Sequence, residues 1–172
     1  MATKPSDKKA ADTATTVNAI KLLTDDHKEV HALFLKYKKL LNSGGAAADR
    51  QPLAEQICLL LTVHATIEEE IFYPAARAAD VESDLLDEAE VEHASVKDLI
   101  AQIRDMGQAD DLYDAKVTVL GEYVDHHVKE EQDEIFPKCA NTEMDLKAIG
   151  AELAARKAEL TAEMTEGMKA TQ

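Results

Sequence analysis

Two segments of this sequence carry histidine, glutamate and proline at the same spacing. His64 precedes Glu68 by four positions and a proline by ten, and His127 precedes Glu131 and a second proline in the same way. Residues four apart lie on nearly the same face of a helix, about 6 Å apart along its axis. Each pair could therefore direct an imidazole and a carboxylate, two groups that bind cations, at the same point.

Two further histidines occupy matched positions ahead of these pairs. His27 follows an acidic residue and precedes Val30 by three positions, and His93 stands in the same relation to Val96. Both histidines fall on the apolar stripe of a predicted helix. The chain thus divides into two similar helical hairpins. If the inner faces of all four helices meet, four imidazoles and two carboxylates converge in one core.

Carboxylates in a protein core need compensating charge, because an ionised group is costly to remove from water. Two metal ions would supply that charge, with each carboxylate able to bridge both ions. Mixed histidine and carboxylate ligands inside a bundle favour iron or manganese over a closed structural zinc site. The alternative is a metal-free bundle whose histidines are hydrogen-bonded core residues. Because the histidines occupy repeated positions, this alternative would have to apply to all four of them at once.

The spacing of apolar residues predicts four long helices that would position these side chains, over about 17–42, 52–79, 83–106 and 111–139. Pro52 suits the first turn of the second helix, and Pro74 could bend that helix. Short connections between helices of this length predict an all-α, up-down-up-down four-helix bundle. An additional amphipathic helix over about 143–164 would pack on the bundle or on a second subunit.

Composition and charge complete the predicted organisation. We expect a disordered tail over 1–15, a metal-binding bundle over 16–140, and a C-terminal amphipathic helix and tail over 141–172. The formal net charge of −15 argues against partners such as nucleic acids and anionic membranes. The sequence contains no apolar run of about 18 residues, the length of a membrane span. It also shows no secretory signal and only two cysteines, so we expect a cytoplasmic location.

The order of these motifs resembles the hemerythrin-like proteins of the HHE cation-binding family, over about residues 17–139. That family carries D-H-x-x-V, H-x-x-x-E-E before a proline, E-H-x-x-V, and H-x-x-x-E before a second proline, and all four elements are present in this order. The resemblance implies a hemerythrin-like bundle with a non-haem di-iron centre. Two bridging glutamates and an oxo or hydroxo group would join the ions, and manganese or zinc could replace iron. The implied metal ligands are His27, His64, Glu68, His93, His127 and Glu131.

Two departures from the oxygen-carrying hemerythrins bear on function. Those proteins carry two histidines one turn apart on the third helix, whereas Lys97 follows His93 by four positions here. They also carry aspartate five positions after the fourth-helix histidine, where this chain has Gln132. One metal position would therefore stay open, or be filled by water or a group such as Glu90. Reaction with hydrogen peroxide, O2 or NO is favoured over stable oxygen carriage.

Two functions follow from this interpretation. The first is a redox protein that handles these small oxidants in oxidative or nitrosative stress defence, with catalase-like turnover as its enzymatic version. The second is an O2, NO or iron sensor, or an iron-binding module without turnover. In the sensor version, residues 143–164 would contact a partner or form a homodimer.

Several residues near the motifs have weaker signals. Tyr123 lies one turn before His127, so it is a candidate donor of a hydrogen bond to a bound oxygen species, or else an ordinary core tyrosine. We expect His31 at the surface or between helices, His126 at the surface, and Cys58 as a buried thiol.

Overall fold

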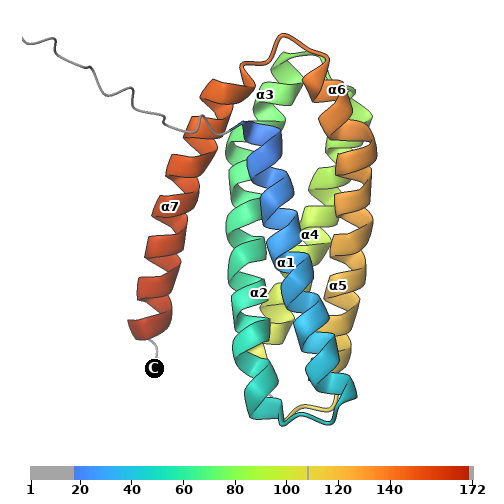
Figure 1. Ribbon diagram of the computed structural model, residues 1–172, viewed down its shortest axis with the longest axis vertical. Helices are drawn as coiled ribbons and strands as arrows, with labels where there is room; N and C mark the ends of the chain where they lie inside the picture. The colour runs from blue at the N-terminus through green and yellow to red at the C-terminus, as the bar shows by residue number, and fades with distance from the viewer. Residues whose placement is uncertain (1–17, 108, 171–172) are drawn as a thin grey trace, which may run out of the picture.

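Four helical rods run alternately up and down around one core in this computed structural model (Figure 1). The structure describes residues 18–107 and 109–170, so the tail expected over 1–15 lies outside the described residues. The predicted all-α bundle with an additional C-terminal helix is confirmed. The rods are α1 (Ala19–Asn42); α2 (Ala47–Ile67), η1 (Glu68–Phe72) and α3 (Tyr73–Ala78); α4 (Ser83–Asp105); and α5 (Tyr113–Glu130), η2 (Glu131–Ile135) and α6 (Phe136–Ala140).

The second rod begins earlier than the sequence predicted. It starts at Ala47, so Pro52 lies inside α2 rather than in its first turn. A proline inside a helix leaves the carbonyl four residues back without its N–H donor. Here that carbonyl belongs to Ala48, which is exposed and can be hydrated, so the helix tolerates the proline.

Each glutamate of the repeat begins a π-helical turn. The N–H of Tyr73 donates to the carbonyl of Glu68 five residues back, and the N–H of Phe136 donates to the carbonyl of Glu131. A proline comes second after each turn, at Pro74 and Pro137, and cannot donate an N–H to continue the regular ladder. The bend expected at Pro74 is therefore a widened turn just before the proline.

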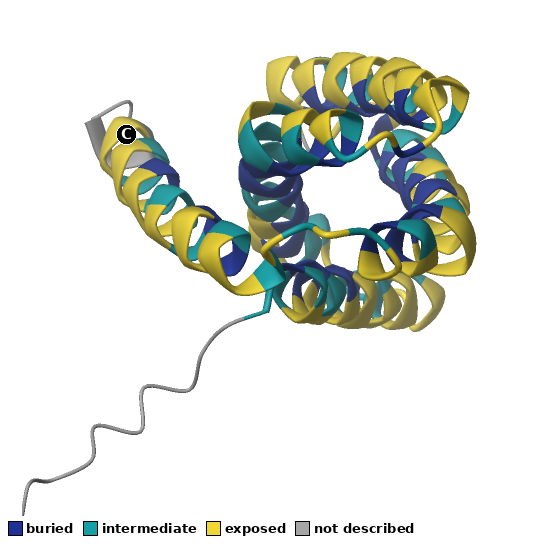
Figure 2. Cartoon of the chain, turned by 90° about the horizontal axis from the view of Figure 1, so that it is seen from above, coloured by how far each residue is buried: buried dark blue, intermediate teal, exposed yellow. Residues whose placement is uncertain are grey.

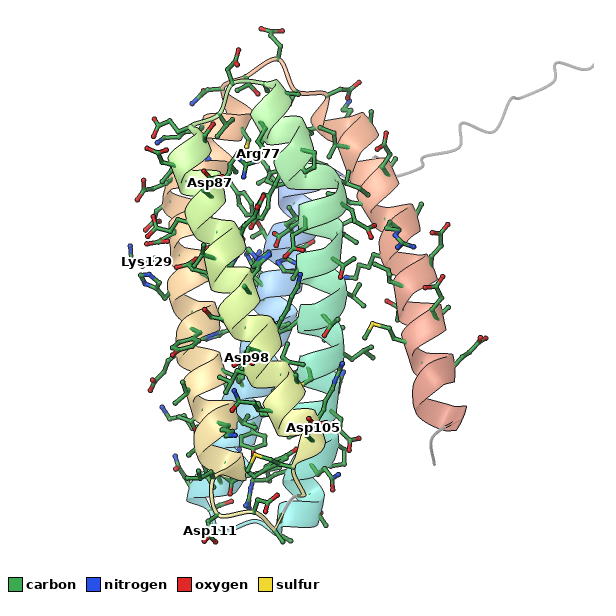
Figure 3. The ribbon with its side chains drawn as sticks, turned by 180° about the vertical axis from the view of Figure 1, so that it is seen from behind. Arg77, Asp87, Asp98, Asp105, Asp111 and Lys129 are labelled. Atoms are coloured by element: carbon green, nitrogen blue, oxygen red, sulfur yellow. The ribbon has the colours of Figure 1, made fainter. Side chains whose placement is uncertain are left out.

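Buried side chains form two apolar clusters along the bundle. One contains Leu23, Phe72 and Phe136, near the end where α3 and α6 lie. The other contains Ile57 and Leu120, towards the opposite end. Figure 2 shows the buried faces of the rods turned inwards, while charged residues such as those labelled in Figure 3 lie on the outside.

The C-terminal helix α7 (Leu146–Ala170) stands outside the ring of four rods and packs against α1 and α2 (Figures 1 and 2). Leu153 is fully buried and Leu160 is 9% exposed, so the apolar face of α7 is covered within the chain. Of the two arrangements that the sequence left open, the structure shows packing on the bundle. None of the helices in the described ranges is long and apolar enough to cross a membrane.

The contact between α1 and α5 leaves little room at Gly121. A Cβ built there would lie 3.2 Å from Cδ1 of the Phe34 ring. We expect Gly121→Val to lower the free energy of unfolding by about 1–3 kcal/mol, because the added methyl groups overpack this contact. Gly167→Val in α7 is the matched control, since a Cβ there meets no atom within 4 Å. Chemical denaturation of both metal-free variants checks this, and equal losses would contradict it.

Candidate metal centre

The six residues that the sequence singled out as ligands lie together between the two apolar clusters. The first and third rods contribute one histidine each, and the second and fourth contribute one histidine and one glutamate each. The glutamates are fully buried and the histidines are at most 6% exposed. The six residues are His27, His64, Glu68, His93, His127 and Glu131.

The four imidazoles meet in two pairs through their Nε2 atoms. The Nε2 atoms of His27 and His64 are 2.9 Å apart, and those of His93 and His127 are 3.0 Å apart. Two nitrogens that bind one ion at about 2.1 Å, at about 90° to each other, would lie about 3.0 Å apart. Each pair therefore has the spacing of neighbouring ligands on one octahedral ion.

Glu68 lies between the two imidazole pairs. Its Oε1 atom is 3.2 Å from Nε2 of His64, and its Oε2 atom is 3.3 Å from Nε2 of His93. One carboxylate oxygen thus faces each pair, as a carboxylate that bridges two cations requires.

Glu131 brings the second carboxylate to the centre. Its Oε2 atom lies 3.1 Å from Nε2 of His27 and 3.6 Å from Nε2 of His127. Its Oε1 atom accepts a hydrogen bond of 2.9 Å from the hydroxyl of Tyr73. The same hydroxyl lies 3.5 Å from Nε2 of His93, so Tyr73 joins the centre beside the second imidazole pair.

Three carboxylate oxygens at this centre are buried without a hydrogen-bond partner among the described residues: both oxygens of Glu68 and Oε2 of Glu131. A buried polar atom without a partner is destabilising, and more so when it carries charge. Cations between these oxygens and the imidazole nitrogens would satisfy all of them. Nitrogen and carboxylate donors suit iron, manganese or zinc, so the residues present fit a pair of such ions.

The outer nitrogen of every imidazole faces a side chain beyond the centre. An imidazole whose Nδ1–H donates outwards presents Nε2 to a metal, and its partner fixes the orientation of the ring. Gln132 thus lies beside His27 rather than at the centre itself. Carboxylate oxygens face Nδ1 of three rings: Asp26 faces His64 (3.3 Å), Glu69 faces His93 (3.0 Å) and Glu92 faces His127 (2.7 Å). Nδ1 of His27 instead faces the amide nitrogen of Gln132 (3.3 Å), a group that donates rather than accepts.

Two of these outer partners are the acidic residues of the repeated D-H-x-x-V and E-H-x-x-V elements, to which the sequence assigned no contact. Asp26 directly precedes His27 but contacts His64, and Glu92 directly precedes His93 but contacts the other histidine of its pair. The acidic residue of each repeated element therefore contacts the histidine on the other helix of the same hairpin.

The charges of the centre control its protonation when no metal is bound. Burial alone would lower the pKa of His64, but the charge of Glu68 and the hydrogen bond with Asp26 raise it to about 10. Burial would raise the pKa of Glu68, but His64 and His93 hold it well below its ordinary value. The metal-free centre therefore holds its buried carboxylate charge beside a protonated imidazole.

A small cavity adjoins the imidazole pairs. It offers about 20 Å³ to the centre of a water-sized molecule, which is room for roughly one water. Besides the histidines and Asp26, its walls are apolar: Val30, Leu61, Ala65, Val96, Val124 and Val128. A ligand that enters this cavity must therefore be very small, and a neutral one meets no desolvation penalty for charge.

The role expected for Tyr123 is wrong. Tyr123 is 49% exposed and lines a surface hollow with His126. The buried residues of α5 form a stripe that includes Val124 and has His127 at one edge. Tyr123, one turn before His127, lies just outside that edge and faces solvent. The buried hydroxyl at the centre belongs to Tyr73, five positions after Glu68, which the sequence analysis missed.

The other nearby residues lie away from the centre. His31 is exposed and lies 3.3 Å from Asp125, which links α1 to α5, and His126 is also exposed. Cys58 is a buried thiol, and burial raises its pKa to about 11. Glu90 accepts a hydrogen bond from Arg77 at the outside of the bundle, at the end where Figure 3 labels Arg77, so it does not fill a metal position.

Fold and centre together define a cation-binding four-helix bundle. Residues 18–139 match the family model of the Hemerythrin HHE cation binding domain, and the chain belongs to this family. It shares its fold with the crystal structure of a hemerythrin HHE cation binding domain-containing protein from Mycobacterium kansasii, with a TM-score of 0.73 and 23% identity. That match covers 89% of this chain and 93% of the other.

A curated relative with a different description also matches. The chain is 30% identical over 119 residues to a protein of Nostoc sp. (strain PCC 7120) named DNA nickase. The match covers 67% of this chain but only 32% of the relative. The chain therefore spans about a third of the length of that protein.

The metal-free protein is expected to lose stability as the pH rises. Because folding raises the pKa of His64 from 6.5 to about 10, the imidazolium contributes its full stability below about pH 6.5 and loses it as the pH approaches 10. Chemical denaturation of chelator-treated protein between pH 6.5 and pH 10 measures this decline. His126→Ala should retain the decline and His64→Ala should weaken it. A flat profile in the unsubstituted protein would contradict the prediction.

Proposed function

We propose that this protein is a non-haem di-iron protein that binds or reacts with hydrogen peroxide, O2 or NO, in oxidative or nitrosative stress defence. The observation that carries the proposal is Glu68: its two buried oxygens have no hydrogen-bond partner among the described residues, and each faces one imidazole pair. The cofactor is two iron ions with an oxo or hydroxo bridge, and manganese or zinc could occupy the same positions. The proposed ligands are His27, His64, Glu68, His93, His127 and Glu131.

The residues around the centre suit redox chemistry on a very small molecule. When bound, a pair of irons supplies two electrons, one from each ion. The apolar cavity walls exclude bulk water and disfavour charged molecules. Burial and the nearby carboxylates raise the pKa of Tyr73 well above its ordinary value, so its hydroxyl stays protonated. Tyr73 thereby holds a proton at Oε1 of Glu131, next to the centre.

The third rod supports a reactive centre rather than a stable oxygen carrier. Lys97, one turn after His93, donates to Glu69 outside the centre. Each proposed iron thus receives two histidines, and the cavity leaves space for a small ligand beside them. Retention of two buried free thiols, Cys58 and Cys139, suits the reducing cytoplasm that we propose as the location.

A second candidate is an O2, NO or iron sensor, or an iron-binding module without turnover. The position of α7 favours it, because this helix lies outside the ring yet contacts α1 and α2, which carry half of the centre. A partner or a second copy that contacts residues 143–164 could then sense the state of the centre. The formal net charge of −15 disfavours a nucleic acid as that partner.

Removal of one proposed ligand tests the metal assignment. We expect His64→Ala to lower bound iron from about two ions per chain and to lower the melting temperature of the iron-loaded protein, because bound metal stabilises the fold. His31→Ala, an exposed histidine of α1, is the matched control and should keep both properties. If His64→Ala retains full iron and an unchanged or higher melting temperature, the histidine is not a ligand.

Added hydrogen peroxide distinguishes the two candidate functions. Oxygen release over many turnovers, retained in His31→Ala and lost in His64→Ala, is expected for the redox protein. A stoichiometric change in the visible spectrum without oxygen release would instead support the sensor or iron-binding module. An iron-loaded protein whose spectrum responds to none of hydrogen peroxide, O2 and NO would contradict both.

A further inference from the structure

Each half of the centre contains a histidine whose outer nitrogen meets a carboxylate paired with a lysine. In the half that contains His93, Nδ1 lies 3.0 Å from Oε1 of Glu69, and Lys97 donates to the same oxygen at 2.7 Å. His93 and Lys97 belong to α4, and Glu69 belongs to η1. This chain of contacts is therefore complete within the four rods.

The other half obtains its lysine from outside the ring. Nδ1 of His64 lies 3.3 Å from Oδ2 of Asp26, and Lys157 donates to Oδ1 of Asp26 at 2.5 Å. Lys157 belongs to α7, the helix that stands apart from the ring in Figures 1 and 2. Asp26 is only 8% exposed, so it has little water available to replace the ammonium group.

The neighbouring residue attaches α7 to the same half of the bundle. Arg156 donates to both oxygens of Glu70, at 2.7 and 3.2 Å, and Glu70 lies two residues after Glu68 in η1. This ion pair lies at the surface, with Arg156 31% and Glu70 44% exposed, and surface ion pairs contribute little to stability. Arg156 and Lys157 thus have different roles in α7. Arg156 attaches the helix to the surface of the bundle, whereas Lys157 contacts Asp26, the partner of the proposed ligand His64.

We propose that docked α7 acts as a latch on the metal position of His27 and His64, with Lys157 as a positioning residue that holds Asp26 against Nδ1 of His64. The carboxylate partner of a ligating histidine fixes its ring and strengthens its bond to the metal. Loss of the contact between Lys157 and Asp26 loosens this ion and leaves the ion at His93 and His127 in place. The inference rests on the two-metal centre proposed above.

Release of Fe²⁺ to an excess of chelator, measured without oxygen on the full chain, tests the latch. In Lys157→Gln, we expect one of the two ions to leave about tenfold faster than in the unsubstituted protein, and the other at an unchanged rate. Lys157→Arg keeps the charge and should restore slow release. Circular dichroism and the melting temperature of each metal-free variant establish that it is folded, and the 29% exposure of the Lys157 side chain favours folding.

Two matched variants separate positioning from general loosening. Arg156→Gln should release both ions at rates within about twofold of the unsubstituted protein, because it leaves Asp26 and Lys157 paired. Lys97→Gln should speed release of the ion at His93 and His127. The double variant Lys97→Gln/Lys157→Gln should speed release of both ions. Unchanged release in Lys157→Gln, or equal acceleration of both ions in Lys157→Gln and Arg156→Gln, would overturn the latch. An unsubstituted protein that binds fewer than two ions would overturn the proposed function itself, and the latch with it.

Discussion

The burial of two carboxylates at the middle of the bundle is the constraint on which the rest of this structure depends. Glu68 and Glu131 are both fully buried, and three of their four oxygens have no hydrogen-bond partner in the described parts of the chain. Charge in such a place requires compensation close by. The four imidazoles lie directly beside these carboxylates, and the apolar clusters on either side of the centre keep water out.

The repeat in the chain explains how such a centre is built. Each hairpin contributes one isolated histidine and one histidine–glutamate pair, and each glutamate begins a π-helical turn before a proline. π-Helical turns interrupt the regular ladder and recur at functional sites in proteins. The two imidazole pairs differ in the lysine beside them. Lys97, which pairs with the carboxylate next to His93, lies within the four rods, whereas Lys157, which pairs with the carboxylate next to His64, comes from α7.

Much of the fold and the centre could be predicted because both depend on spacing along single helices. Residues four apart share a helix face, so His64 and Glu68 had to lie together, and the match with His127 and Glu131 predicted a shared core. Contacts that depend on how different helices face each other were not predictable in this way. Asp26 supports His64 rather than its neighbour in sequence, and the role of Tyr73 follows from the meeting of two rods.

The error at Tyr123 has a related cause. Its distance from His127 places both on similar faces of α5, but the buried stripe of a helix is set by all of its neighbours rather than by one ligand. His127 lies at the edge of that stripe, so one further turn reaches solvent. The start of α2 at Ala47 was missed because proline is better tolerated near an exposed helix end than the sequence rule implies.

The central claim, that Glu68 lies between two metal ions, can be tested by crystallography of the iron-loaded protein with data collected on both sides of the iron absorption edge. We expect two anomalous peaks, one beside His27 and His64 and the other beside His93 and His127, with one oxygen of Glu68 directed at each. A single peak, or no peak near Glu68, would contradict it.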